Sequence, residues 1–408
     1  MTMGRTAAWF CATAFLAAGC ESADAPPGFE VVDSAGVRIV INDRSDPGAG
    51  GRIVVEQEPT LSIGTLDGSE EEQLFRVTDA TRLPDGRIAV LNVGSGEVRF
   101  YGADGRHLRS VGAPGDGPGE FRNPFWIARR ADTLVIFDPF QDNGRATTLD
   151  LNGDLIATYR LSTEAHRFPN PSTLLADGTF LDAMGEGSIG DTETGHVRFT
   201  HIPVRYPRTG SPIDTIAVVP GSELYRAAEA TFVVQTPVPF GREAFTTAGP
   251  DLIYTGNGEE AAVEAFDLSG SHQLSIRFPE ERDAVTPELV ARWIDAQLAD
   301  APFAGRPDEA ERVQQARERY AAPPVPATMP AHGELLVDED RRLWVRRYAP
   351  PWEPGNEWMV FGADGVWLGD AAMPPELRVF EIGRDWVLGV VQDEISVEYL
   401  RMHRWSIH

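Results

Sequence analysis

Two histidines stand at positions from which a general base can act. Histidine is the side chain that most often takes up and releases protons near neutral pH. Of the eight histidines in the sequence, His166 and His332 each lie just before a run of residues that predicts a β-strand. Each is either a catalytic base or a loop histidine with its hydrogen bonds satisfied. We expect no catalytic residue, and these two are the candidates if the chain is an enzyme.

Five arginines recur at comparable places, at or just before predicted β-strands. A guanidinium group binds carboxylate or phosphate through two parallel hydrogen bonds. Five of them at one mouth of a channel would form an anion-binding site. The alternative is that each arginine pairs with a nearby Asp or Glu and links neighbouring parts of the fold. The candidate ligand-binding residues are Arg76, Arg122, Arg167, Arg242 and Arg378.

The composition excludes several kinds of chemistry. All 36 basic residues are Arg, so the P-loop and Schiff-base mechanisms, which need a lysine amine, are ruled out. The net charge of −26 argues against nucleic acid as a partner, because the overall field repels phosphate backbones. We expect neither a metal nor a cofactor. The sequence has no HExxH motif, and the loop from Asp138 to Gly144 lacks the spacing of an EF-hand.

A repeated pattern organises most of the chain. Six stretches each contain a short β-rich run, a turn with Asp or Gly, and a second β-rich run, and further strand-like runs follow. One unit holds four strands in about 45 residues, which is the size of a propeller blade. The sequence therefore predicts an all-β fold, a six-bladed β-propeller over residues 31–408. The turns align on Asp85, Asp132, Asp177, Asp251, Asp340 and Asp385.

Two segments of the sequence depart from this repeat. The strand-like runs at 36–42 and 52–64 precede the first unit, while the last unit has only three strands. We expect one of these N-terminal strands to complete the last blade and so remove the open sheet edges at the seam. Residues 286–321 of the fourth repeat predict a helical hairpin, starting with Thr286 as N-cap and Pro287 at the first helical position. It either decorates the rim or caps one mouth of the central channel.

The N-terminus predicts export. Residues 1–19 have the form of a signal peptide, with Arg5 before an apolar run too short to span a bilayer. The run ends in Leu16-Ala17-Ala18-Gly19-Cys20, which resembles the lipobox of bacterial lipoproteins. That resemblance implies cleavage before Cys20 and lipidation of its thiol, with residues 20–30 as a tether. The alternative is an ordinary secretory signal in which Cys20 occurs by chance.

Taken together, the sequence resembles the bacterial six-bladed β-propeller lipoproteins, which share their architecture with NHL-repeat and TolB-like propellers. The resemblance rests on DSAGVRIVIN (33–42), GDGPGEFRNP (115–124) and the repeated β-turn-β unit. It implies the fold more strongly than the function, since such propellers serve in binding, scaffolding and catalysis. Propeller lyases of similar fold place His near the channel, sometimes with a divalent metal. The resemblance thus implies a divalent cation in the channel as the alternative cofactor.

Our leading hypothesis is a non-enzymatic binding module. We expect a monomeric propeller in the cell envelope, lipid-anchored to a bacterial membrane at the outer membrane or the periplasmic face. Its rigid loops would present a concave surface to an unidentified protein, peptide or glycan. The competing hypothesis is a lyase or hydrolase with its site at the channel mouth.

Overall fold

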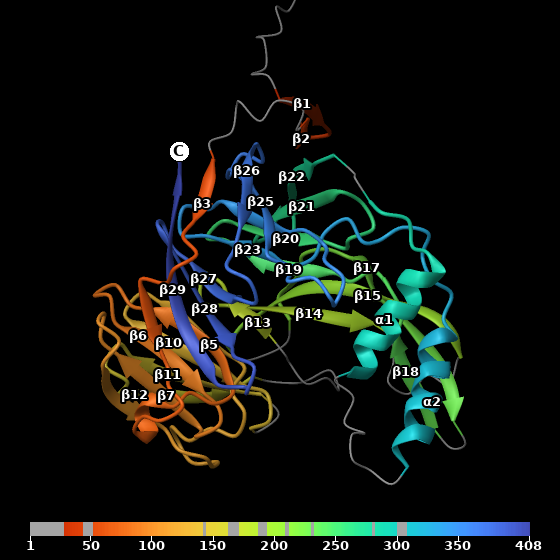
Figure 1. Cartoon of the computed structure of the whole chain (residues 1–408). Helices are drawn as coiled ribbons and strands as arrows, with labels where there is room; N and C mark the ends of the chain where they lie inside the picture. The colour runs from red at the N-terminus through yellow and green to blue at the C-terminus, as the bar shows by residue number, and fades with distance from the viewer. Residues whose placement is uncertain are drawn as a thin grey trace, which may run out of the picture.

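The computed structural model describes residues 28–43, 52–141, 144–161, 171–186, 194–208, 212–229, 232–279, 282–299 and 308–408. Within these ranges the strands form six sheets, and Figure 1 shows the α-helices on one side of the molecule. The predicted all-β class is confirmed. No helix in the described ranges is long and apolar enough to cross a membrane.

The sheets are numbered one to six in the chain order of the strands that begin at Val77, Trp126, Pro171, Phe245, Leu335 and Arg378, which are called their first strands below. Sheets one, two and five are four-stranded and antiparallel. Sheet one holds β5 (Val77–Arg82), β6 (Ile88–Asn92), β7 (Glu97–Tyr101) and β8 (His107–Val111). Sheet two holds β9 (Trp126–Arg130), β10 (Thr133–Asp138), β11 (Arg145–Asp150) and β12 (Leu155–Arg160). Sheet five holds β23 (Leu335–Val337), β24 (Leu343–Arg346), β25 (Glu357–Phe361) and β26 (Trp367–Ala372).

The other three sheets are extended. Sheet three holds β13 (Pro171–Leu174), β14 (Phe180–Glu186), β15 (Gly195–Tyr206), β16 (Asp214–Thr215), β17 (Val219–Glu229) and β18 (Phe232–Pro237). Sheet four holds β19 (Phe245–Ala248), β20 (Leu252–Gly256), β21 (Ala262–Asp267), β22 (His272–Arg277), β1 (Phe29–Ser34) and β2 (Val37–Asn42). Sheet six holds β27 (Arg378–Ile382), β28 (Trp386–Gln392), β29 (Glu398–Ile407), β3 (Ile53–Val55) and β4 (Leu61–Ile63).

Apolar side chains pack each sheet face to face against its neighbours. Six clusters lie between sheets one and two, two and three, three and four, four and five, five and six, and six and one. Each sheet is therefore covered on both faces, which explains why the central strands are apolar throughout instead of alternating. All five residues of β6 are buried, as are all but the last residue of β28.

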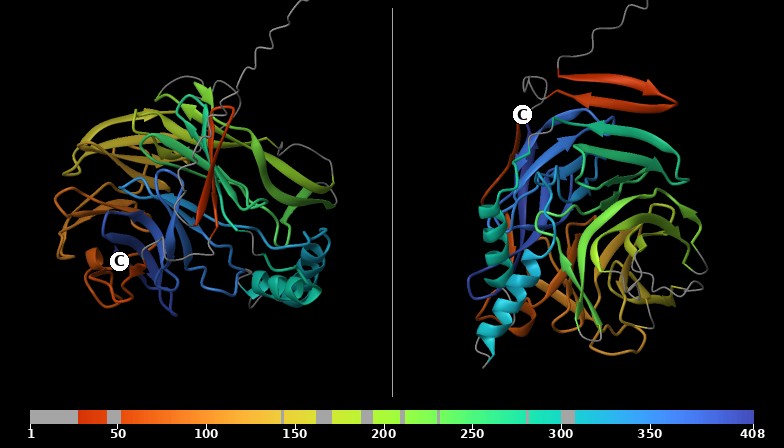
Figure 2. Two further views of the ribbon diagram at one scale, coloured as in Figure 1. Left: turned by 90° about the horizontal axis from the view of Figure 1, so that it is seen from above. Right: turned by 90° about the vertical axis from the view of Figure 1, so that its right-hand side faces the viewer.

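The N-terminal strands close this ring of sheets. On β29, Leu400 and Met402 pair with Ile63 and Leu61 of β4, while Trp405 pairs with Val55 of β3. The prediction that an N-terminal strand completes the last unit is thus confirmed. The earlier segment joins a different sheet, because β2 pairs in parallel with β22. Figure 2 shows the resulting β1–β2 hairpin at the periphery of the molecule.

The aligned aspartates all lie in equivalent turns. Each of the six positions falls between the first and second strands of its sheet. At Asp177, for example, the carboxylate accepts a hydrogen bond from the Thr179 N–H at 2.9 Å, and Gly178 adopts a φ of 86°. Such a positive φ is strained for residues with a Cβ, so glycine is required there. The repeated turns place the ends of all six first strands at one end of the ring.

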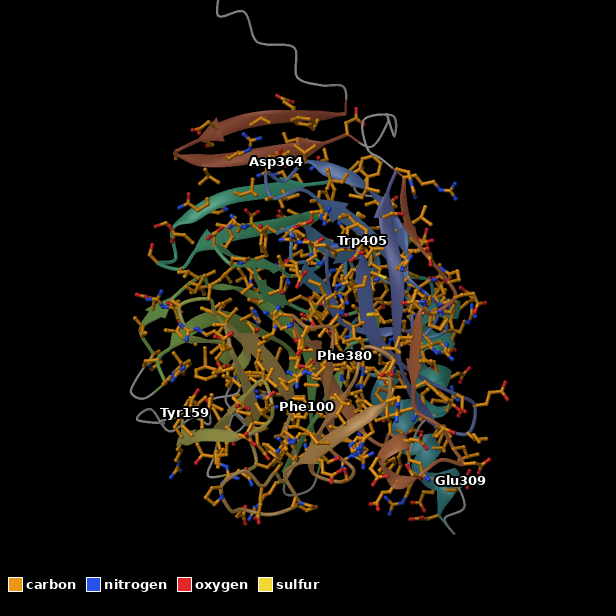
Figure 3. All side chains as sticks on the ribbon, turned by 90° about the vertical axis from the view of Figure 1, so that its left-hand side faces the viewer. Phe100, Tyr159, Glu309, Asp364, Phe380 and Trp405 are labelled. Carbon is orange, nitrogen blue, oxygen red and sulfur yellow. The ribbon has the colours of Figure 1, made fainter. Side chains whose placement is uncertain are left out.

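Two helices lie between β22 and β23: α1 (Pro287–Ala299) and α2 (Glu309–Ala321). A short 3₁₀ turn, η1 (Glu70–Glu72), precedes sheet one. α1 buries Trp293 and Ile294 against Phe240, Tyr348 and Trp352. Figure 3 shows Glu309, at the start of α2, on the outer edge of the molecule, whereas Phe380 lies inside it.

Candidate functional site

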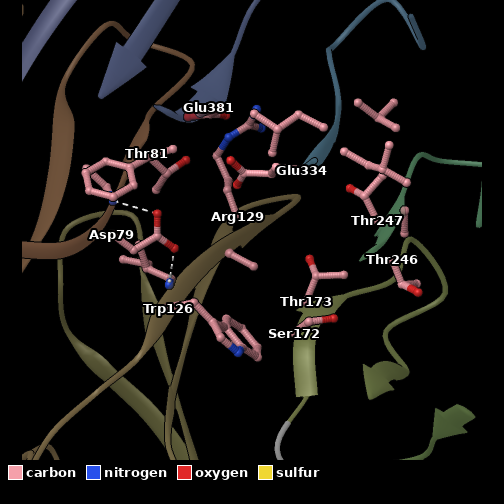
Figure 4. Close-up of a pocket in the computed structure, with 18 of the residues that line it drawn as sticks. Asp79, Thr81, Trp126, Arg129, Ser172, Thr173, Thr246, Thr247, Glu334 and Glu381 are labelled. Atoms are coloured by element: carbon pink, nitrogen blue, oxygen red, sulfur yellow. Dashed lines mark hydrogen bonds between the residues drawn. The ribbon is translucent and has the colours of Figure 1, made fainter. Parts of the chain in front are cut away.

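The candidate site is a cavity at which the first strands of all six sheets meet, called the axial cavity below. Its volume is about 440 Å³, within the range of small-ligand sites. Ser and Thr hydroxyls from β5, β13 and β19 line it together with charged and aromatic side chains (Figure 4). The charged residues are Asp79, Arg129, Glu334 and Glu381, and the aromatic ones are Trp126, Phe245 and Phe380.

Asp79 on β5 links sheet one to sheet two. Its carboxylate accepts hydrogen bonds from the Ala80 N–H at 2.8 Å and from the Ile127 N–H on β9 at 2.9 Å (Figure 4). Burial raises the pKa of Asp79 to about 7, although both backbone hydrogen bonds and Arg378 act to lower it. Desolvation therefore outweighs the groups that favour the charged form. Glu381 adds a smaller upward contribution to this pKa.

Glu381 on β27 behaves in the same way on the adjoining wall. One carboxylate oxygen accepts a hydrogen bond from the Arg82 N–H at 2.8 Å. Burial raises the pKa of Glu381 to about 7, against the lowering effects of this bond, of Thr81 and of Arg129. Two carboxyl groups in one cavity thus titrate near neutral pH. They can accept or release protons, or donate a hydrogen bond when protonated.

Glu334 adds a third carboxyl group, just before β23. Burial raises its pKa, while Arg346 and Arg378 lower it. Its ion pair with Arg346 is loose, at 4.0 Å. Carboxyl groups therefore outnumber the single guanidinium group, that of Arg129, among the side chains lining the axial cavity. This wall favours ligands that carry positive charge or hydrogen-bond donors.

A second cavity of about 610 Å³ lies at the end of the first strands, and we call it the arginine mouth. Arg82, Arg129, Arg384, Glu339 and Trp386 are among its lining residues. Arg129 lines both this cavity and the axial cavity, so the two are neighbours. The positive groups gather where the aligned Asp turns also lie.

The predicted arginines Arg76 and Arg122 lie outside the axial cavity. The Arg76 guanidinium donates a hydrogen bond to the Asn123 side chain at 2.6 Å, joining sheet one to the segment before β9. The Arg122 guanidinium pairs with Asp116 at 2.5 Å, and its side chain is 55% exposed. Arg122 thus pairs with an Asp, as the alternative interpretation expects, whereas Arg76 contacts an Asn side chain and no Asp or Glu among the described residues.

Arg242 and Arg378 also have partners within the protein. The Arg242 side chain is buried and donates hydrogen bonds to the carbonyl of Thr328 at 2.9 Å and to that of Phe240 at 3.2 Å. Arg378 donates to the carbonyl of Val77, which links β27 to β5. Arg167 lies outside the described residues. The structure does not gather the four described arginines of the predicted set into one pocket.

His332 is fixed in the interior and His166 lies outside the described residues. The Nε2 atom of His332 accepts a hydrogen bond from the Gly258 N–H at 3.2 Å, and Nδ1 bonds the Gly333 carbonyl at 2.8 Å. Burial lowers the pKa of His332, and an Nε2 atom that accepts a hydrogen bond carries no proton. Both nitrogens are thus engaged by backbone groups. His332 lines a separate cavity of about 150 Å³ beneath α1.

No cluster suited to a metal ion lies in the described part of the chain. Among the described residues, no group of three or more His, Cys, Asp or Glu side chains comes close enough to hold a metal. The part of the Asp138–Gly144 loop at 142–143 and the proposed lipidation residue Cys20 fall outside the described ranges. The signal peptide 1–19 falls outside them as well.

The site residues that sequence reasoning missed share a register signal. Arg82 and Arg129 each stand three positions before an aligned Asp, in neighbouring sheets. Asp79 and Glu334 each stand six positions before one. Residues at equal offsets share a cavity, because Arg82 and Arg129 both line the arginine mouth and Asp79 and Glu334 both line the axial cavity. Comparing offsets would have placed these four residues along the axis.

No model of a known protein family matches the sequence, and no curated protein sequence matches it.

Several solved structures are similar in overall shape. A member of the DUF4221 family from Bacteroides vulgatus is 12% identical, with a TM-score of 0.47, and the match covers 88% of this chain and 100% of that one. Virginiamycin B lyase from Staphylococcus aureus is 11% identical, with a TM-score of 0.40 and the same coverage. Regucalcin, a calcium-binding protein from Agrobacterium tumefaciens, is 11% identical, with a TM-score of 0.37, covering 82% and 92%. At these values none assigns an activity to this chain.

Proposed function

We propose that the chain is a six-bladed β-propeller that binds a ligand in its axial cavity, as a binding module of the cell envelope. The observation that carries this proposal is the cavity itself, to which all six first strands contribute side chains. The strands present their edges to this space, so backbone groups and short polar side chains can meet a ligand from every side. Such a rigid ring needs little reorganisation on binding.

The lining groups favour a small polar ligand, or a polar end of a peptide or glycan. Hydroxyl groups and three carboxyl groups supply hydrogen-bond acceptors, while Trp126 and Phe380 offer faces for sugar rings or cations. The volume of about 440 Å³ suits a compact ligand better than a whole protein surface.

A plug in the axial cavity tests this function. Thr247 lines the cavity on the side opposite Asp79 (Figure 4), and Thr247→Trp would fill much of the space. We expect wild-type protein to retain a compound from an envelope extract, as read by native mass spectrometry, and the variant to lose at least about 90% of it. Thr215→Trp, at the exposed position of β16, is the matched control and should retain it.

Retention by Thr247→Trp equal to that of wild type would contradict binding in the axial cavity. Circular dichroism of each variant would verify that the fold is intact.

The cell-envelope location rests on the N-terminal sequence. We propose that the signal peptide 1–19 is removed and that lipid on Cys20 anchors the protein to a bacterial membrane through the tether 20–30. The Cys20→Ala variant is then expected to leave the membrane fraction and appear in the soluble fraction. Cys11→Ala, within the signal peptide, is the control and should stay membrane-bound. Membrane retention of Cys20→Ala would refute the anchor.

A second candidate function is proton-transfer catalysis in the same cavity. It is favoured by Asp79 and Glu381, whose pKa values of about 7 suit a general acid or base at neutral pH. The recovered compound separates the two functions, because a binding module returns it unchanged. Conversion by wild type, but not by Glu381→Gln, would favour the enzyme.

A further inference from the structure

The arginine mouth brings positive charge together in a protein of net charge −26. Its three arginines come from three neighbouring sheets: Arg82 ends β5, Arg129 lies on β9, and Arg384 lies in the turn between β27 and β28. A fourth sheet contributes Glu339, the one acidic side chain lining this cavity. Positive charge therefore prevails in a cavity of about 610 Å³ that adjoins the axial cavity.

Arg82 has no carboxylate partner in the described part of the chain. Its side chain contacts the Trp386 ring at 5.3 Å, and no hydrogen bond from its guanidinium to a described residue is formed. Its Nε is buried without a partner, and so is the Nε of Arg129. A buried donor without an acceptor is costly, which points to a missing ion or ligand group.

Other arginines in this protein show what a satisfied side chain looks like. Arg145 also has a buried Nε without a partner, but its terminal nitrogens donate to the carbonyls of Asp116 at 2.8 Å and Glu120 at 2.6 Å. Arg82 differs because its terminal nitrogens have no such acceptors among the residues that the structure describes. It also differs in lining a cavity open to ligands.

The other two arginines of the arginine mouth, Arg129 and Arg384, form only long or exposed ion pairs. Glu339 lies 3.6 Å from the Arg129 guanidinium, and Asp340 lies 3.3 Å from that of Arg384. Arg384 is 74% exposed. Pairs of this length and exposure contribute little stability. An oxyanion with better geometry can replace them at small cost.

We propose that Arg82, Arg129 and Arg384 form an oxyanion site, which binds the carboxylate or phosphate group of a ligand. The guanidinium forks match both groups through paired hydrogen bonds. Because Arg129 also lines the axial cavity, one ligand can place its anionic group here and its remaining part among the hydroxyl groups beyond. This last step rests on the proposed function of the axial cavity.

The test is calorimetric titration with inorganic phosphate and, separately, with acetate, at constant ionic strength set by sodium chloride. We expect Arg82→Ala to weaken phosphate binding about tenfold, since a charged hydrogen-bond donor is removed. Glu339→Gln is expected to tighten it about threefold, because a competing carboxylate is lost. Arg109→Ala removes the same charge from an exposed pair on β8 and is the matched control.

The outcomes are distinct. Acetate binding that also depends on Arg82 indicates carboxylate ligands, and binding of phosphate alone indicates phosphorylated ones. Equal weakening by Arg82→Ala and Arg109→Ala would reduce the effect to general charge and overturn the site. So would no binding of either anion by wild type.

A variant separates this inference from the proposed function. Thr247→Trp fills the axial cavity from sheet four, whereas the three arginines belong to sheets six, one and two. We expect it to bind phosphate as wild type does while losing the retained compound. If wild type retains a compound but binds no phosphate, the oxyanion site alone is overturned. Phosphate binding with compound retention unaffected by the plug would overturn the axial site alone.

Discussion

Ile63→Asp is expected to lower the free energy of unfolding by about 4 kcal/mol, because it buries a carboxylate where the ring closes. Ile63 lies on β4, pairs with Leu400 of β29, and is only 4% exposed. It packs among apolar side chains between sheets six and one, including Leu74 and Tyr101. The neighbours in this cluster are apolar except for the Tyr101 hydroxyl, which already donates to the Glu71 carbonyl at 2.8 Å. Denaturant unfolding monitored by circular dichroism measures the effect.

The matched control is Val31→Asp on β1. Val31 is 41% exposed and lies outside the closing strands, so we expect a change below about 0.5 kcal/mol. If both variants lose the same small amount, β4 does not close the ring and the architecture proposed here is wrong.

Glu381→Gln is expected to become more stable relative to wild type as the pH rises from about 5 to about 8, by about 2 kcal/mol. Burial raises the pKa of Glu381 in the folded protein to about 7, from an ordinary value of 4.5. The folded protein therefore holds this proton more tightly than the unfolded chain. The resulting stability is fully present below the unfolded pKa and is lost as the pH rises through about 7. Glutamine has no such proton to lose.

The comparison must be made as a difference between the two proteins. Burial lowers the pKa of His201, His332 and His403, which makes stability rise with pH near neutrality. These histidines are present in both proteins, so their contribution cancels in the difference. Glu394→Gln, at an exposed position between β28 and β29, serves as control. A difference between Glu381→Gln and wild type that stays constant with pH would show that Glu381 is not desolvated.

The repeat pattern in the sequence predicts most of the architecture. The six aligned aspartates were placed by sequence in turns, and each lies between the first and second strands of a sheet. Local turn chemistry and apolar strand runs determine such features, so they can be read from the chain. The pairing of β2 with β22 cannot be read in this way, because the two strands lie far apart in the chain and no local pattern in DSAGVRIVIN (33–42) specifies its partner.

The site was harder to predict than the fold. Sequence reasoning sought arginines before the first strands, whereas Arg82 and Arg384 lie at the other end of those strands. Which of these residues lie near one another emerges only when distant repeats are compared at equal offsets from the aligned aspartates, and no single repeat contains that information. Asp79 and Glu381 were missed for a related reason. Their unusual pKa values arise from burial by neighbouring sheets and not from adjacent residues.

The two neighbouring cavities carry charges of opposite sign. Carboxyl groups line the axial cavity and arginines line its neighbour, so charge changes sign along the axis. A ligand with donor groups at one end and an oxyanion at the other would complement both. That polarity also predicts a preferred orientation of the bound molecule.

A crystal structure of the wild-type protein carrying the compound that it retains tests the central claim most directly. The account predicts electron density for that compound in the axial cavity, within hydrogen-bond distance of Asp79, Glu334 or Glu381. Density on the outer rim, with the axial cavity holding only water, would contradict it.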